Sequence, residues 1–404
     1  MAPLEWETMP LDDVAELDIE RVAVEPDAEY RLAGVSIAGR GLFWRDTILG
    51  RETNYPALQR LRTGQLVMRK LTAWEGPITT VPAEFDGGYV SSEFPTFALD
   101  EERLLPKYMR LICQHPEFHA EMRLRSTGTP ERRNRLKPDD LLSIEINIPP
   151  VDQQHAIVGV VDAFDKALAA AMLESEALDL LQRSVREELL GNIGDGDVVL
   201  ANVLTGIEGG QSPQCLNRPP RDGEWGVLKL SAVRPGLFRD TEAKALPPGE
   251  PPFTAAELRA GDLIITRSNT RERVGAICRV RETRPRLLLA DLTWRLRVDL
   301  ERVDSDYLVE ALSGRAARQQ IEAQATGTSE SMKKISQKIL RTIEIPLPLL
   351  DEQRDIAKAL RPFQDTTDAL EVERLRLVGA RARALESLLS GRAHLGMLAE
   401  ELEA

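Results

Sequence analysis

The chain has 404 residues, more than a single hydrophobic core usually holds, so we expect at least two domains. Its 42% hydrophobic content excludes general disorder, and there is no run of about 18 apolar residues that would predict a membrane span. The formal net charge of −13, taken alone, argues against a protein that binds nucleic acid, because neutralising phosphates needs Lys and Arg.

The compartment can be predicted from the N-terminus and the cysteines. Met1–Pro10 has neither a basic region nor an apolar region, so a signal peptide is not expected. Cys113, Cys215 and Cys278 are far apart and odd in number, which predicts reduced thiols rather than disulfides or a zinc site. These features predict a cytoplasmic protein that does not enter a membrane.

In chain order, the first expected strands are Gln65–Arg69 and Ile78–Val81, and a helix fits Pro106–Arg123. Ile144–Pro149 is apolar in alternation and ends at proline, as a closing strand would. A long helix should follow, because apolar residues recur there at alternating spacings of 4 and 3, as in a coiled-coil seam. These are Ile157, Val161, Phe164, Leu168, Ala171 and Leu178.

The second half of the chain repeats this order. Strands are expected at Leu263–Thr266, Val274–Val280, Leu287–Leu289 and Ile343–Pro348, and a helix at Ser305–Gln324. The second long helix repeats the seam of the first, with Ile356, Leu360, Phe363, Thr367, Leu370 and Leu377. Asp152 and Asp351 are expected as N-caps of the two long helices, and Gly191 and Gly391 as their C-terminal stops.

The two halves align without a gap over 127–158 and 326–357, at an offset of 199 residues. The matches include Gly128 with Gly327 and Gln154 with Gln353. The sequence therefore predicts an α+β protein with a pseudo-two-fold internal repeat, in which two long antiparallel, coiled-coil-like helices join two units. The expected boundaries are 1–150 and 193–349 for the units, and 151–192 and 350–404 for the helices. Two heads around such an axis suit a two-part site on duplex DNA.

Two local charge runs reverse the overall acidity. Residues 103–137 and 264–297 each hold nine basic and three acidic residues, a local excess of +6. Such runs are typical of phosphate-binding surfaces. An ordinary solvated surface is the alternative for either run.

Several segments resemble type I restriction-modification specificity subunits, and the resemblance covers nearly the whole chain. They are KLTAWEGPITTVPAEFDGGYVSSEFPTF at 70–97, GIEGGQSP at 206–213, GVLKLSAV at 226–233, GDLIITRSNTR at 261–271, and the two repeated TGT…I-x-I-P…Q runs. The order of these motifs, repeated around long helices, is more specific than any one of them.

The resemblance implies a non-catalytic subunit with two target-recognition domains, each reading half of a bipartite DNA sequence across a gap set by the helices. The implied partners are double-stranded DNA, two modification (methyltransferase) subunits, and restriction subunits that translocate DNA. S-adenosylmethionine, ATP and magnesium would be bound by those partners and not by this chain. Because the two units differ outside the shared motifs, an asymmetric target is expected.

No motif for catalysis is found. The chain lacks a Walker A run and a glycine-rich cofactor loop, and NRPP at 217–220 does not match the motif of amino-methyltransferases. His115 and His119 have the spacing of a metal pair, but no ligand cluster accompanies them, so surface histidines are the favoured interpretation.

DNA contacts are expected from the loops within the basic runs, because Arg can pair with guanine, Asn with adenine, and Lys with phosphate. In the first unit the candidates are Arg69, Lys70, Trp74, Arg132, Arg133 and Arg135. In the second unit they are Arg267, Asn269, Arg271, Arg273, Lys333 and Lys334. For each one, solvation or a local salt bridge is the alternative, and packing is the alternative for Trp74.

Other apolar residues lie off the helical seam and suggest a surface for a further partner: Leu173, Leu180, Leu190, Leu385 and Leu389. Two other functions stay open at this stage. One is a DNA-recognition scaffold of a different phage-defence assembly. The other is a stand-alone nuclease or methyltransferase, against which the absence of motor, cofactor and nuclease motifs speaks.

Overall fold

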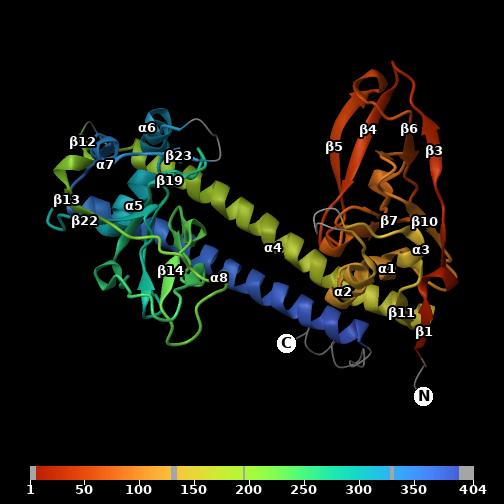
Figure 1. The fold of residues 1–404 in the computed structure, drawn as a ribbon. Coiled ribbons are helices and arrows are strands. Elements are labelled where there is room, and N and C mark those ends of the chain that lie inside the picture. The colour runs from red at the N-terminus through yellow and green to blue at the C-terminus, as the bar shows by residue number, and fades with distance from the viewer. Residues whose placement is uncertain (1–5, 129–133, 194–195, 328–331, 391–404) are drawn as a thin grey trace. The chain divides into compact units, whose positions relative to one another are not determined.

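The structure is a computed structural model that describes residues 6–128, 134–193, 196–327 and 332–390 (Figure 1). The chain packs into two compact units. Unit 1 comprises Met1–Ala170 and Leu375–Ala404, and unit 2 comprises Ala171–Arg374. Each unit therefore contains one part of each long helix, whereas the sequence had led us to treat the helices as separate spacers.

The same two sheets occur in both units. In unit 1, β1 (Glu7–Pro10) pairs antiparallel with β11 (Glu145–Ile148), and a four-stranded sheet has the order β2-β10-β7-β8. In unit 2, β12 (Asp197–Val199) pairs antiparallel with β24 (Glu344–Pro346), and a four-stranded sheet has the order β13-β22-β18-β20. The remaining bounds are β2 Ala15–Leu17, β7 Leu66–Met68, β8 Ile78–Thr80, β10 Thr96–Leu99, β13 Leu204–Gly209, β18 Leu263–Thr266, β20 Ile277–Arg279 and β22 Thr293–Val298. The predicted strands at these positions are confirmed, and so is the repeat.

Each predicted short helix is in fact two helices. In unit 1, α1 (Pro106–Ile112) ends before α2 (Pro116–Arg125), because a proline lacks the N–H of a continuing helix and disfavours helical backbone before it. In unit 2, α5 (Ser305–Ser313) and α6 (Arg315–Gln324) are separated by Gly314, whose ψ of 154° is extended. The expected single helices over 106–123 and 305–324 were wrong in this respect. A further short helix precedes the closing strand of each unit, α3 (Pro138–Leu142) in unit 1 and α7 (Gln337–Arg341) in unit 2.

A buried glutamine explains the most regular part of the repeat. Gln154, in the first turn of the first long helix, is fully buried in unit 1. Its Oε1 accepts a hydrogen bond from the amide of Leu105 at 2.9 Å. Its Nε2 donates to the carbonyls of Arg103 at 2.7 Å and Pro149 at 2.9 Å. One side chain thus joins the closing strand, the long helix and the segment that enters α1.

Gln353 makes the same three bonds in unit 2. It accepts from the amide of Asp304 at 2.8 Å and donates to the carbonyls of Arg302 at 3.0 Å and Pro348 at 2.8 Å. Every partner lies 199 residues beyond its counterpart in unit 1. Residues that are 199 positions apart in the sequence therefore make the same buried contacts in the two units.

Replacing Gln353 with alanine should lower the free energy of unfolding of unit 2 by roughly 3 kcal/mol, because three buried backbone groups lose their partner. Equilibrium urea unfolding of the full chain, read by amide hydrogen exchange in peptides of unit 2, measures this. Gln320→Ala is a matched control, since the half-buried Gln320 also makes two backbone bonds, to Glu344, at an exposed position where water can replace them. Equal losses in the two variants would contradict the role given to burial.

The two long helices are α4 (Val151–Gly191) and α8 (Leu350–Leu389). Asp152 and Asp351 lie inside the first turn and not at the N-cap as expected, where a carboxylate still favours the positive end of the helix dipole. Gly191 ends α4 as predicted. Gly391 lies outside the described residues.

The predicted seam coincides with the less exposed side of both helices. In unit 1, Val161 and Phe164 of α4 share a core with Leu385 and Leu388 of α8. In unit 2, Leu360 and Leu370 of α8 are buried, and Leu190 of α4 packs on the core. Antiparallel coiled-coil pairing along the whole seam stays a prediction.

Outside the shared sheets the units differ. Unit 1 has a five-stranded sheet in the order β3-β6-β9-β4-β5, whereas unit 2 has a three-stranded sheet, β17-β14-β21, and the short pair β15-β16. The bounds are β3 Glu20–Ala23, β4 Glu29–Val35, β5 Leu42–Leu49, β6 Ala57–Arg60, β9 Tyr89–Val90, β14 Gly226–Leu228, β15 Val233–Arg234, β16 Leu237–Phe238, β17 Ala243–Ala245 and β21 Leu287–Leu288. The interpretation of two unlike heads is consistent with this difference.

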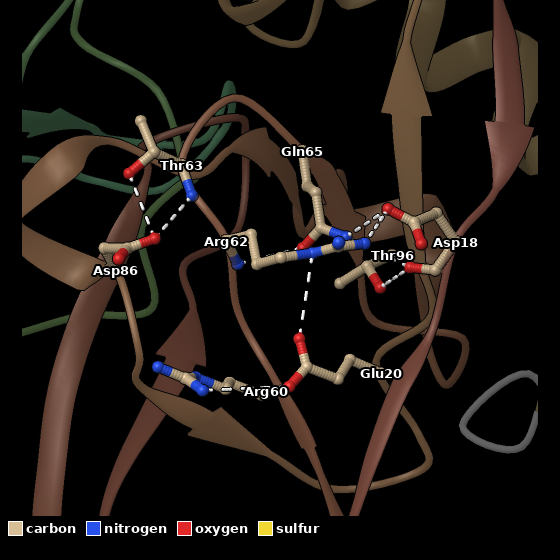
Figure 2. A network of polar contacts seen from close by, with 8 residues as sticks. All are labelled: Asp18, Glu20, Arg60, Arg62, Thr63, Gln65, Asp86 and Thr96. Carbon is tan, nitrogen blue, oxygen red and sulfur yellow. Dashed lines mark hydrogen bonds and ion pairs between the residues drawn. The ribbon is translucent and has the colours of Figure 1, made fainter.

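A polar network anchors the five-stranded sheet of unit 1 to its shared sheet (Figure 2). Asp18, between β2 and β3, binds the guanidinium of Arg62 and accepts a bond of 2.8 Å from Gln65. Its carbonyl accepts from the hydroxyl of Thr96 on β10. Arg62 also lies 3.9 Å from Glu20 on β3. The network fixes the point at which the chain passes from one sheet to the other.

The cysteines Cys113 and Cys278 are buried, and burial raises the pKa of both thiols, so they stay protonated. Within the described ranges, no helix is both long enough and apolar enough to cross a membrane.

Candidate nucleic-acid interface

In unit 2, two loops that are far apart in sequence meet as a small antiparallel pair. β19 (Ser268–Asn269) pairs with β23 (Lys333–Lys334), which places Asn269 opposite Lys333 and Ser268 opposite Lys334 (Figure 1). Next to this pair, the carbonyl of Arg267 accepts a bond of 2.9 Å from the amide of Ile335. The predicted candidates from both loops thus lie on one patch.

Unit 1 builds the same junction. The carbonyl of Lys70 accepts a bond of 3.1 Å from the amide of Leu136, the residue that corresponds to Ile335 in the repeat. Leu71 forms an antiparallel bridge with Arg135. Lys70 and Arg267 therefore take equivalent places, as do Arg135 and Lys334. Arg132 and Arg133 lie outside the described residues.

The cations of the unit 2 patch are largely without internal partners. Arg271 and Arg273 are exposed, and no residue of the described part of the chain accepts a hydrogen bond from either guanidinium. The same holds for the ammonium of Lys334. Lys333 donates to the carbonyl of Gly327 at 3.0 Å. Within the described part of the chain, the charged groups of Arg271, Arg273 and Lys334 therefore have no hydrogen-bond acceptor.

Arg69 in unit 1 is different, because its guanidinium binds its own loop. It donates to the carbonyl of Leu71 at 2.9 Å, to the hydroxyl of Thr72 at 2.6 Å and to the carboxylate of Glu75 at 2.8 Å. Thr72 has a φ of 54°, a left-handed backbone that is strained for a β-branched residue. These bonds favour a role for Arg69 in holding the loop in that conformation.

The other unit 1 candidates are partly engaged. Arg135 is exposed and lies 3.0 Å from the carboxylate of Glu93. The half-buried ring of Trp74 lies 5.4 Å from the guanidinium of Arg123, and its Nε1 has no partner among the described residues. Lys70 is half-buried. Packing is the better interpretation of Trp74.

Most arginines of the basic run over 264–297 bind groups within unit 2 and are therefore not available to a ligand. Six of its arginines bind acidic groups or carbonyls within unit 2: Arg279, Arg281, Arg284, Arg286, Arg295 and Arg297. The pair of Arg295 with Asp262, at 3.1 Å, is buried. Only the first part of the run, from Arg267 to Arg273, contributes cations to the patch.

Three residues of this neighbourhood were not among the sequence candidates. Gln211 and Ser212 belong to the GIEGGQSP motif, and Asp291 is one of the few acids of the basic run. A Cβ on Gly210 would lie 1.9 Å from the carbonyl oxygen of Leu289, so glycine there allows the motif to run against 289–291. The motif signalled this close approach, but no feature of the sequence singled out Asp291.

A hollow of about 310 Å³ adjoins the patch, lined by Arg267, Trp294, Lys334, Ile335, Ser336 and Gln337. No group of three or more potential metal ligands occurs within the described ranges. His119 contacts the carbonyl of Cys113 at 2.7 Å, and His115 lies 3.9 Å from Glu117.

Comparisons with known proteins connect this geometry to a family. Residues 303–378 match the model of the type I restriction modification DNA specificity domain. The EcoEI specificity subunit of Escherichia coli is 31% identical over 173 residues, which are 43% of this chain and 29% of that protein. The EcoKI specificity subunit of E. coli K12 is 22% identical over 259 residues, which are 59% and 54% of the two chains.

A solved structure has the same fold. The S subunit of a type I restriction-modification system from M. genitalium aligns over 96% of this chain and 97% of its own, with a TM-score of 0.53 and 14% identity. One segment of the chain therefore matches the type I restriction modification DNA specificity domain, and the chain is similar to specificity subunits of type I restriction enzymes. It spans about half, or less, of the length of the two curated family members named above.

Two residues of the matched span have counterparts in unit 1. The matched span holds Tyr307 and Gln353, whose counterparts in unit 1 are Tyr108 and Gln154. Tyr307 donates to the carbonyl of Pro346 at 2.6 Å, and Tyr108 to that of Asn147 at 3.4 Å. The tyrosine and glutamine contacts of the matched span in unit 2 therefore recur in unit 1.

Proposed function

We propose that this chain is the DNA-recognition component of a type I restriction-modification complex, in which each unit reads one half of a bipartite, asymmetric target. The observation that carries the proposal is the repeated loop junction at Lys70 and Arg267, which places basic residues at equivalent positions of the same scaffold in both units. The unlike sheets beside the junctions support two unlike half-sites.

The residue types of the unit 2 patch suit this task. Arg and Asn can pair with guanine and adenine in the major groove, and Lys binds phosphates. Because the net charge of the chain is −13, we infer that its affinity for DNA comes from these local patches together with partner subunits.

We also propose that the chain has no catalytic activity of its own. Two modification subunits would supply methylation with S-adenosylmethionine, and restriction subunits would supply ATP-driven translocation and cleavage with magnesium. Support for partner binding comes from α4, where Leu173 and Leu180 are 67% and 70% exposed. Leu385 is instead buried in the core of unit 1, and Leu389 and Leu190 pack on their own cores, so these three were wrongly assigned to a partner surface.

The purified chain is expected neither to methylate nor to cut DNA, whereas addition of its modification subunits should give methylation of one motif. Transfer of labelled methyl groups from S-adenosylmethionine to plasmid DNA measures the first activity, and plasmid linearisation with ATP and magnesium measures the second. Turnover by the chain alone, in a preparation free of the partner subunits, would contradict the proposal and favour a stand-alone enzyme.

A further inference from the structure

The guanidinium of Arg267 donates no hydrogen bond to any of the residues that the structure describes. Other arginines of unit 2 use several of their donors, as Arg297 does with Glu208 and Arg318 does with the carbonyls of Val274 and Glu272. Arg267 has one carboxylate near it, and its buried Nε has no hydrogen-bond partner within the described ranges. An arginine has five N–H donors, so most of this capacity is available to a ligand.

The single carboxylate is that of Asp291, whose Oδ2 lies 4.0 Å from Nη2 of Arg267. Asp291 is itself fixed. The hydroxyl of Ser212 donates to its Oδ1, and its amide donates back to the Ser212 hydroxyl at 3.3 Å. Ser212 is held near 289–291 because Gly210 has no Cβ and Gln211 donates its amide to the carbonyl of Leu289 at 3.2 Å. A chain of contacts thus runs from the GIEGGQSP motif to Arg267.

Stability does not account for this arrangement. The side chains of Arg267 and Asp291 are 39% and 44% exposed, and ion pairs of that kind add little to folding. The pair does place a carboxylate beside a long side chain at the edge of the patch. The backbone of Arg267 is also fixed, since it bonds Leu292 through its amide and Ile335 through its carbonyl.

We propose that Asp291 is the positioning residue that presents the guanidinium of Arg267 to the O6 and N7 atoms of a guanine in the half-site read by unit 2. This inference rests on the proposed function. The carboxylate lies 4.0 Å from one edge of the guanidinium, and the other edge keeps two parallel N–H groups, the geometry that guanine accepts in the major groove. Asn269, on β19 two residues farther along, is placed to contact an adjoining base or phosphate.

The test uses the complex of this chain with its modification subunits and DNA duplexes that carry the motif it methylates. Each guanine of the unit 2 half-site is replaced in turn by 7-deazaguanine, which lacks the N7 acceptor, and Kd is measured at fixed salt. One such replacement should weaken binding of the unaltered complex about tenfold, in the lower part of the range for a bidentate base contact, because the O6 acceptor remains. The complex with Arg267→Ala should bind that modified duplex and the normal duplex equally.

Three further variants separate positioning from a structural role. Asp291→Asn should reduce the discrimination between the two duplexes to about threefold or less while leaving the melting temperature and the salt dependence of binding unchanged. Asp291→Glu should retain part of the discrimination that Asp291→Asn loses. Asp306→Asn removes a similarly exposed carboxylate that pairs with Arg279 at 2.6 Å, and it should leave discrimination at the wild-type level.

The outcomes distinguish the inference from the function on which it rests. A complex that binds no specific motif would contradict the proposed function. A specific complex whose unit 2 half-site has no guanine, or in which Arg267→Ala discriminates like wild type, would overturn the contact. The positioning role of Asp291 is wrong if Arg267→Ala loses the discrimination between the normal and the modified duplex while Asp291→Asn keeps it. It is also wrong if Asp291→Asn weakens binding of all duplexes equally.

Discussion

Replacing Glu310 with alanine should lower the free energy of unfolding of unit 2 by about 3–5 kcal/mol, the usual cost of leaving a buried charge without its partner. Glu310 lies on α5 and accepts a bond of 2.7 Å from Nε of Arg186 on α4. The side chains of the two residues are only 7% and 4% exposed. Gln364 on α8 donates to the other oxygen of Glu310 at 3.1 Å. One carboxylate therefore holds three helices together within unit 2.

Urea unfolding of the full chain measures this loss, with amide hydrogen exchange in peptides of α5 reporting on unit 2 separately from unit 1. Asp365→Ala is the control, because the pair of Asp365 with Arg281 is more exposed and should cost less than about 1 kcal/mol. The double variant Arg186→Met, Glu310→Leu should be more stable than Glu310→Ala alone, since no charge is left buried. A small effect of Glu310→Ala would show that Arg186 finds another partner or solvent.

Inserting seven residues into both long helices should widen the gap between the two half-sites by about three base pairs and leave the half-sites unchanged. The insertions follow Ala170 in α4 and Arg374 in α8, where the chain passes from one unit to the other. Seven residues preserve the repeat of the seam and add about 10 Å of helix, and duplex DNA rises about 3.4 Å per base pair.

Sequencing of methylated DNA from cells that carry the altered gene reads the gap directly. A seven-residue insertion after Gly249, in an exposed turn of unit 2, is the control and should leave the motif unaltered. A changed half-site, or an unchanged gap after the helical insertions, would contradict the role of the helices as a ruler.

Much of the shared architecture could be predicted because it depends on local pattern. The 199-residue offset follows from matched residues in the two halves of the sequence. Apolar spacing predicts the closing strands β11 and β24 and the seams of α4 and α8. The breaks at Pro116 and Gly314 were missed, although the proline was visible, because the apolar pattern continues across both of them.

The unlike sheets could not be predicted, because their strands are short and pair with distant segments. β9, for example, has two residues and lies between β6 and β4. The candidate site shows the same limit. The sequence motifs located the loops around Arg267 and Lys333. They could not show which arginines of the basic run bind carboxylates, because Glu208 and Asp262 are distant from Arg295 in the sequence and contact it only in the folded chain.

The most direct test of the account is methylome sequencing of the source cell with and without this gene. The account predicts that deletion removes methylation from one bipartite, asymmetric motif and that complementation restores it. Loss of no motif, or loss of an uninterrupted palindromic one, would contradict recognition by two unlike units.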